Sequence, residues 1–159
     1  MLFVKSLVKP LLAVLLLGLL AAPARAQREK LPPEDLEFVQ KNWPQAKKTT
    51  TGLRYVVMKE GSGEMPKPGS KVAVVYVGRL LDGKVFNELD DRANPFVFRV
   101  RRGEVIEGWD QILQQMKVGE RRLVIIPGEL AYGTRGRPPD IPRNATLVFE
   151  IELLEIKKD

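Results

Sequence analysis

The sequence predicts an α+β fold in which an antiparallel sheet wraps around one short helix. From Leu53 onward the chain consists of short alternating or Val-rich segments separated by turn residues, which is typical of strands. The one segment of the core with helical spacing is 107–116. Its apolar residues stand at i, i+3, i+4 and i+7, and Gly119 follows as a stop. These two observations favour a sheet packed on a single amphipathic helix.

Five strands are expected, over residues 55–58, 71–80, 96–101, 121–126 and 145–156. Asp82 and Gly83 form a hairpin-type turn after the second of them. In the third, Phe96, Phe98 and Val100 alternate with Val97, Arg99 and Arg101, so its aromatic face should point inward. Residues 130–143, which are rich in Gly and Pro, should form a loop before the last strand.

Residues 1–26 are predicted to be a signal peptide that is removed. Two lysines precede an apolar run over 11–22, and residues 24–26 form an A-x-A cleavage site. The apolar run is shorter than the roughly 20 residues of a spanning helix, and without Cys the chain has no lipid attachment site. We therefore expect a periplasmic or secreted protein with no stable membrane anchor after cleavage.

Residues 27–51 are predicted to be an N-terminal arm and linker ahead of a domain over 52–159. A proline pair and two acidic residues at 32–35 mark the start of a short helix, and Pro44 ends it. We expect this helix to lie on its own domain, with a docking or dimerising helix as the alternative. Residues 46–52 should be the linker.

The absence of Cys and His excludes thiolate nucleophiles, imidazole bases, disulfides and Cys/His metal sites. Acidic residues gather at 82–91 but lack the ligand pattern of a calcium loop, so a solvated acidic loop is expected there. No serine has a nucleophile-elbow context, and no glycine-rich phosphate loop occurs. We therefore expect neither a metal nor a cofactor.

Charge gives little support for a nucleic-acid partner. Loss of Lys5, Lys9 and Arg25 with the leader lowers the formal net charge from +6 to +3, and export removes the protein from nucleic acid. Arginines at 99–102 and 121–122 leave binding of a polyanion or a membrane surface as an alternative, although such runs usually form a solvated face.

Seven segments resemble, in order and spacing, the signatures of the FKBP-type (tacrolimus-binding) peptidyl-prolyl isomerases. They are residues 76–78, 82–86, 94–98, 104–109, 116–120, 130–133 and 141–150. The resemblance extends from about Gly52 to the C-terminus and implies a half-barrel-like sheet around the short helix. It also implies proline-containing polypeptides and macrolides such as tacrolimus as partners. We expect a monomer.

The chemistry of prolyl isomerisation is compatible with a chain that lacks His and Cys. Rotation about an X-Pro amide has a barrier of about 18 to 20 kcal/mol. The twisted amide has lost its resonance, so it is less polar than the planar ground state, and an apolar aromatic pocket favours it. This mechanism requires no nucleophile, general base or metal.

The resemblance assigns roles around one pocket. The expected catalytic residues are Tyr76, Phe86, Asn87, Phe96, Phe98, Trp109, Tyr132 and Phe149. The expected substrate-binding residues are Arg92, Glu104, Val105, Ile106, Arg137, Asp140 and Ile141. Trp109 would form the floor under the proline ring. The Ile106 N–H and the Tyr132 hydroxyl would donate to ligand carbonyls, and the Glu104 carbonyl would accept a hydrogen bond. Plain core packing is the alternative for Trp109 and Phe98.

The chain departs from the family pattern at three positions. Asn87 replaces the usual Asp that pairs with the arginine matching Arg92, and Arg137 and Asp140 add charge to the pocket rim. Three acidic residues offer other partners for that arginine: Glu88, Asp90 and Asp91. The alternative function is therefore an FKBP-fold binding module or periplasmic holdase with little or no isomerase activity.

Overall fold

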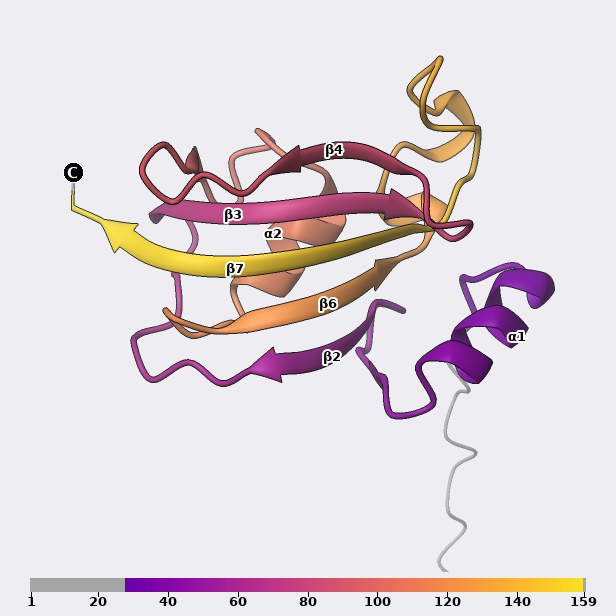
Figure 1. The fold of residues 1–159 in the computed structure, drawn as a ribbon, viewed down its shortest axis with the longest axis horizontal. Helices are drawn as coiled ribbons and strands as arrows, with labels where there is room; N and C mark the ends of the chain where they lie inside the picture. Colours follow the sequence, from indigo (N-terminus) through magenta and orange to yellow (C-terminus); the bar gives the residue numbers. More distant parts are fainter. Residues whose placement is uncertain (1–27, 159) are drawn as a thin grey trace, which may run out of the picture.

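The computed structural model describes residues 28–158, so the predicted signal peptide lies outside the described residues. One seven-stranded sheet forms the frame of this region (Figure 1). Its strands are β1 (Lys47–Lys48), β2 (Arg54–Lys59), β3 (Lys71–Leu80), β4 (Val85–Leu89), β5 (Phe96–Arg99), β6 (Arg121–Ile126) and β7 (Leu147–Lys157). The helices are α1 (Pro33–Asn42), α2 (Glu107–Leu113) and two single 3-10 turns, η1 (Gly128–Leu130) and η2 (Gly133–Arg135). No helix of residues 28–158 is long and apolar enough to cross a membrane.

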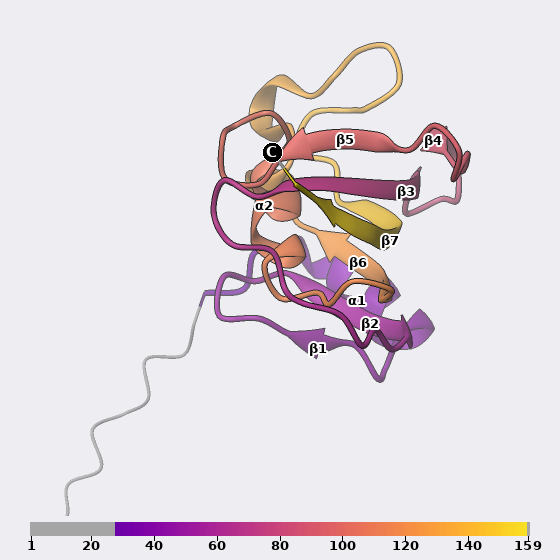
Figure 2. The same cartoon turned by 90° about the vertical axis from the view of Figure 1, so that its left-hand side faces the viewer.

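All paired strands are antiparallel, and their order across the sheet is β1-β2-β6-β7-β3-β4. β5 shares one edge of β3 with β4, because β5 pairs with residues 71–74 and β4 with residues 76–79. Helix α2 lies against one face of the sheet in both views (Figures 1 and 2). The predicted antiparallel sheet around a short helix is confirmed.

Two strands of the structure fall outside the sequence prediction. β4 occupies the segment predicted to be an acidic loop and pairs Asn87 with Gly78 of β3. β1 lies within the predicted linker and pairs Lys47 with Tyr55. Both are short, half-exposed or exposed edge strands, so neither has a long apolar alternation that identifies a strand.

The central helix is shorter than its apolar spacing predicts. α2 ends at Leu113 rather than at Met116, because the chain tightens into a turn there. The Gln115 N–H donates to the Ile112 carbonyl at 2.9 Å and the Met116 N–H to the Leu113 carbonyl at 3.2 Å, a three-residue spacing. β5 also ends early, at Arg99, since Arg101 adopts a left-handed φ of 60°.

The inner core fills the space between α2 and the sheet. Its fully buried side chains include several from the helical segment and from β6 and β7: Ile112, Leu113, Met116, Ile126, Leu147, Ile151 and Leu153. Gly108 allows this approach, because a Cβ at that position would lie 2.6 Å from Ile126 Cγ2. The helix and the residues next to it are therefore held close to the sheet.

The N-terminal segment packs on the outer face of the same sheet. Leu31 and Val39 are buried against Leu123, Ile125 and Val148 of β6 and β7. The expectation that α1 lies on its own domain is confirmed.

Polar contacts also hold the N-terminal segment in place. The Glu29 carboxylate lies 2.7 Å from the Arg54 guanidinium and 2.9 Å from Lys48 Nζ. These pairs and a backbone N–H hold the pKa of Glu29 well below its usual range, although burial opposes the shift. At α1, the Thr146 hydroxyl donates to the Asp35 carboxylate at 2.6 Å.

Candidate functional site

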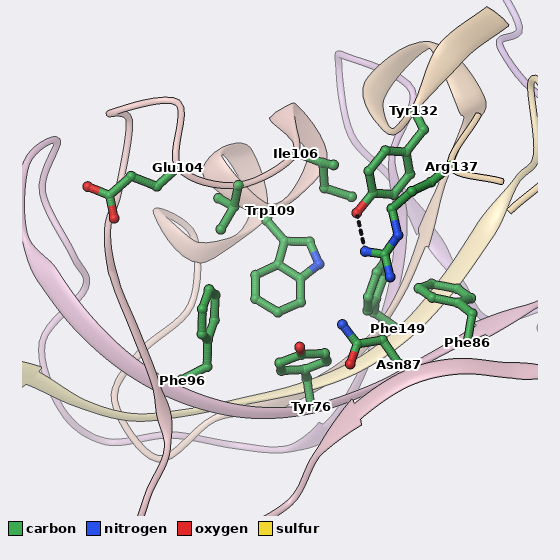
Figure 3. A pocket seen from close by; sticks show the side chains of 11 residues that line it. Tyr76, Phe86, Asn87, Phe96, Glu104, Ile106, Trp109, Tyr132, Arg137 and Phe149 are labelled. Atoms are coloured by element: carbon green, nitrogen blue, oxygen red, sulfur yellow. Dashed lines mark hydrogen bonds between the residues drawn. The ribbon is translucent and has the colours of Figure 1, made fainter. Parts of the chain in front are cut away.

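A pocket of about 220 Å³ opens on the inner face of the sheet, beside the N-terminal end of α2 (Figure 3). Its walls come from β3, β4, β5, β7, α2 and the loops before α2 and β7. The residues that line it are Tyr76, Phe86, Asn87, Phe96, Glu104, Val105, Ile106, Trp109, Tyr132, Arg137 and Phe149. Eleven of the fifteen residues predicted from the sequence thus lie around one cavity.

Trp109 forms the base of this pocket. Its side chain belongs to α2 and is almost fully buried, with only 4% of the residue exposed. Three rings stand edge-to-face against it, with centroid separations of 4.8 Å for Tyr76, 5.2 Å for Phe149 and 6.2 Å for Phe96. The indole Nε1 is buried and has no hydrogen-bond partner within residues 28–158. This N–H is the one buried polar group of an otherwise apolar base.

The aromatic walls require a glycine in β3. Phe86 and Phe149 meet edge-to-face at 5.5 Å over Gly78. A Cβ at Gly78 would lie 2.6 Å from Phe149 Cε1 and 2.8 Å from Phe86 Cζ. Gly78 therefore allows both rings to approach the strand closely. Its packing role is a site requirement that the sequence analysis did not predict, although the residue stands in one of the quoted segments.

Polar groups lie at the edge of the apolar cavity. Arg137 Nη1 donates to the Tyr132 hydroxyl at 3.4 Å, at the opposite end of the pocket from Glu104 (Figure 3). Ile106 is the residue before α2, so its N–H is not used by the hydrogen-bond ladder of the helix. Burial raises the pKa of the Tyr76 hydroxyl and the neighbouring Tyr132 acts in the same direction, whereas Arg137 and a hydrogen bond with Asn87 oppose the shift. Tyr76 therefore remains a neutral hydrogen-bonding group.

Four predicted residues do not line the pocket. Phe98 is 3% exposed and stacks behind Phe96 at 5.3 Å, so the core alternative describes its position. Ile141 is buried in the inner core. The Asp140 carboxylate is directed at Lys84, 3.9 Å away. These side chains support the cavity or its rim without facing it.

Arg92, the fourth, has a partner that the sequence analysis did not name. Its guanidinium lies 2.5 Å from the Glu152 carboxylate of β7, so the expected pairing with an acidic residue of 88–91 is wrong. Asp91 instead accepts hydrogen bonds from the Ala93 N–H and the Asn94 amide. Arg92 is thus ion-paired with β7 on the face of the sheet opposite the pocket.

Two groups of charged residues in the described part of the chain concern the other ligand classes, metal ions and polyanions. Residues 28–158 contain no acidic cluster with the geometry of a metal site. Several arginines proposed for polyanion binding are ion-paired: Arg101 with Glu107, Arg121 with Glu150 and Arg122 with Glu120. Their charges are therefore partly neutralised within the protein.

The open antiparallel sheet with an aromatic pocket beside a short helix agrees with the fold that the resemblance to the FKBP-type isomerases implies. The family described as FKBP-type peptidyl-prolyl cis-trans isomerase matches residues 62–154. The chain belongs to this family.

Individual relatives support this assignment. The chain is 45% identical over 107 residues to peptidyl-prolyl cis-trans isomerase Fkbp12 of Drosophila melanogaster, covering 67% of this chain and 99% of that protein. It is 49% identical over 104 residues, 65% of this chain, to FK506-binding protein 4 of Dictyostelium discoideum, but spans only 28% of that protein's length. A crystal structure of a peptidyl-prolyl cis-trans isomerase from Pseudomonas syringae pv. tomato aligns with a TM-score of 0.69 and 33% identity, covering 82% of this chain and all of that one.

Proposed function

We propose that this protein is a peptidyl-prolyl cis-trans isomerase that rotates X-Pro bonds of exported proteins. One observation carries the proposal: an apolar cavity of about 220 Å³ with the nearly buried Trp109 at its base and aromatic walls. A cavity of this kind binds a proline ring by burial of apolar surface.

The pocket favours the transition state because of its low polarity. The twisted amide is less polar than the planar one, so it loses less solvation on entering the cavity. The Ile106 N–H and the Tyr132 hydroxyl donate to substrate carbonyls at the rim, with Tyr132 on the carbonyl of the residue before proline. The Glu104 carbonyl accepts a substrate N–H. None of these contacts requires a group that transfers a proton.

We propose that the protein works in the periplasm or outside the cell. It is supported by the basic start, the apolar run and the A-x-A site of residues 1–26. Mature protein should begin near Gln27 and bind proline-containing polypeptides and macrolides such as tacrolimus as a monomer. Mass spectrometry of protein from the native host gives the first residue directly. An intact Met1 would contradict the exported setting and leave the pocket chemistry untouched.

Isomerase activity is tested by the rate of X-Pro isomerisation in a short peptide, measured by exchange NMR with the mature protein. The expected result is a rate that rises linearly with enzyme concentration and falls on addition of tacrolimus. A matched control is Phe38→Ala, which removes an exposed ring of α1 and should leave the rate unchanged. A rate equal to that in buffer would contradict the proposal.

A second function is favoured by one observation. The polar residue in the apolar wall is an amide, Asn87, and Arg92 pairs with Glu152 instead. A pocket without a carboxylate could retain binding and have little turnover, as in a binding module or periplasmic holdase. The two functions are separated by comparing ligand binding, followed by tryptophan fluorescence, with the isomerisation rate, which only the isomerase should raise. A Trp43→Phe variant leaves Trp109 as the single indole, whose emission should change on ligand binding in both cases.

A further inference from the structure

Arg137 stands at the mouth of the pocket on a backbone that is held firmly. The Arg137 N–H donates to the Ile141 carbonyl and the Ile141 N–H to the Arg137 carbonyl, both at 2.9 Å. The preceding Gly136 has a φ of 63°, and a Cβ there would lie 2.6 Å from the Ile141 carbonyl oxygen. This closed turn fixes the Cα position from which the Arg137 side chain reaches the pocket.

The Arg137 guanidinium is held beside the pocket by an aromatic ring. Its Cζ lies 5.7 Å from the centroid of the Tyr132 ring, and Nη1 donates to the Tyr132 hydroxyl at 3.4 Å. Among residues 28–158 no carboxylate forms an ion pair with it, and Asp140 of the same turn is directed at Lys84. Most of its donors therefore remain available to a ligand.

Other arginines near the sheet differ from Arg137 in this respect. Arg79, Arg92 and Arg121 each have a carboxylate within 2.9 Å, supplied by Glu150 or Glu152. The carboxylates of those pairs belong to β7 and lie on the face of the sheet away from the cavity. Arg137 differs from these arginines in two ways: it lines the cavity, and no carboxylate of residues 28–158 pairs with it.

The charges of the pocket are separated along its length. Arg137 lies at one end, Glu104 at the other and Trp109 between them (Figure 3). The Glu104 carboxylate accepts the Arg99 backbone N–H at 3.1 Å, so it faces away from Arg137. A substrate with negative charge near the Tyr132 end and none near the Glu104 end matches this field.

We propose that Arg137 is a specificity-determining residue that binds the carboxylate of an Asp or Glu preceding the proline of the substrate. The inference rests on the proposed isomerase function, because it takes the proline ring to lie over Trp109 and the carbonyl of the preceding residue to lie at Tyr132. The side chain of that preceding residue is then the one nearest the guanidinium. A planar guanidinium binds a carboxylate through two parallel hydrogen bonds, which an amide of the same shape cannot reproduce.

The test compares peptides that differ only by Glu or Gln before proline. The ratio of kcat/KM, Glu over Gln, should be about fivefold at low salt, the size typical of a partly exposed ion pair, and should decrease as salt is added. In Arg137→Gln the ratio should approach one, whatever happens to the absolute rates. Arg135→Gln is the matched control: it removes the same charge from an exposed neighbour that does not line the pocket, and the ratio should remain.

Three results would overturn the inference: a ratio near one in the unsubstituted protein, a ratio retained in Arg137→Gln, or a preference that appears only when Glu follows proline. Failure of the isomerase function is seen separately, as absence of turnover of either peptide. The ratio of the two Kd values, measured by Trp109 fluorescence in the Trp43→Phe background, then decides the inference in place of the ratio of kcat/KM.

Discussion

The two faces of the sheet use the same strands for different purposes. Along β7, Phe149 and Ile151 face the inner side, while Val148, Glu150 and Glu152 belong to the outer side. Inner aromatic rings meet edge-to-face and leave a cavity between them. Outer side chains are covered by α1 at one end and ion-paired at the other, so the outer face has little apolar surface left to bind with. The inner aromatic rings therefore border a cavity that can take a ligand, whereas the outer side chains of β7 are already covered or ion-paired.

Removal of the base of the pocket should have the largest effect. Trp109→Ala should destabilise the protein by about 3 to 5 kcal/mol, because it deletes a nearly buried indole that four rings contact. Urea unfolding followed by circular dichroism measures this change. An unfolding free energy within 1 kcal/mol of the original would mean that the inner face does not depend on its central ring.

Truncation on the outer face should affect stability alone. Val39→Ala removes two methyl groups of a side chain that is 1% exposed, at a cost of about 2 kcal/mol. Because Val39 contacts the outer cluster and not the pocket, kcat/KM at a temperature where the variant is folded should equal that of the original. A decrease in kcat/KM with folded protein would show that the two faces are coupled.

Asn87→Asp changes the polarity of the pocket wall. A carboxylate at this position can accept a charge-assisted hydrogen bond from the Tyr76 hydroxyl, which an amide provides more weakly. We expect kcat/KM to rise about tenfold, equivalent to roughly 1.4 kcal/mol. Asn42→Asp makes the same substitution in α1 and should leave kcat/KM unchanged. An unchanged or lower rate for Asn87→Asp would show that the charge does not contribute to catalysis.

The ion pairs of the outer face should give the smallest effect, and one that depends on pH. Burial raises the pKa of Glu152. The hydrogen bond and charge of Arg92 and the charge of Lys59 together lower it by more, so the net pKa is below its usual value. A depressed carboxyl pKa stabilises the fold above the unfolded value of 4.5, and this contribution is lost as the pH falls through the folded value. In Glu152→Gln, Tm should therefore depend less on pH below 5. The corresponding change in the free energy of unfolding should be less than about 1 kcal/mol. An equal slope in both proteins would contradict this.

The sequence predicted the elements with clear periodicity and missed those without it. Residues 71–80 and the apolar spacing around Ile112 identified the central strand and the helix. β4 escaped prediction because an exposed edge strand needs no apolar alternation. The predicted end of α2 at Met116 was also wrong, because the helix ends at Leu113. Met116 is nevertheless buried, since the chain continues as a tighter turn against the same core.

The resemblance predicted which residues form the site, whereas their arrangement was seen only in the structure. Phe96 and Phe98 lie on the same face of β5, so alternation alone cannot tell which of them reaches the opening. The partner of Arg92 depends on the pairing of β3 with β7, where the register shifts between Ala73 and Val74. Such long-range register is not written in local residue patterns.

The position of α1 has a consequence for the order in which the chain acquires structure. Helix α1 is synthesised before every strand of the sheet, yet the surface it covers is completed by Val148 of the last strand, β7, and the Asp35–Thr146 contact spans 111 residues. A ten-residue helix is marginal by itself in water. Residues 31–42 should therefore become stably structured only after β7 has joined the sheet. Closure of this long loop belongs among the late steps of folding.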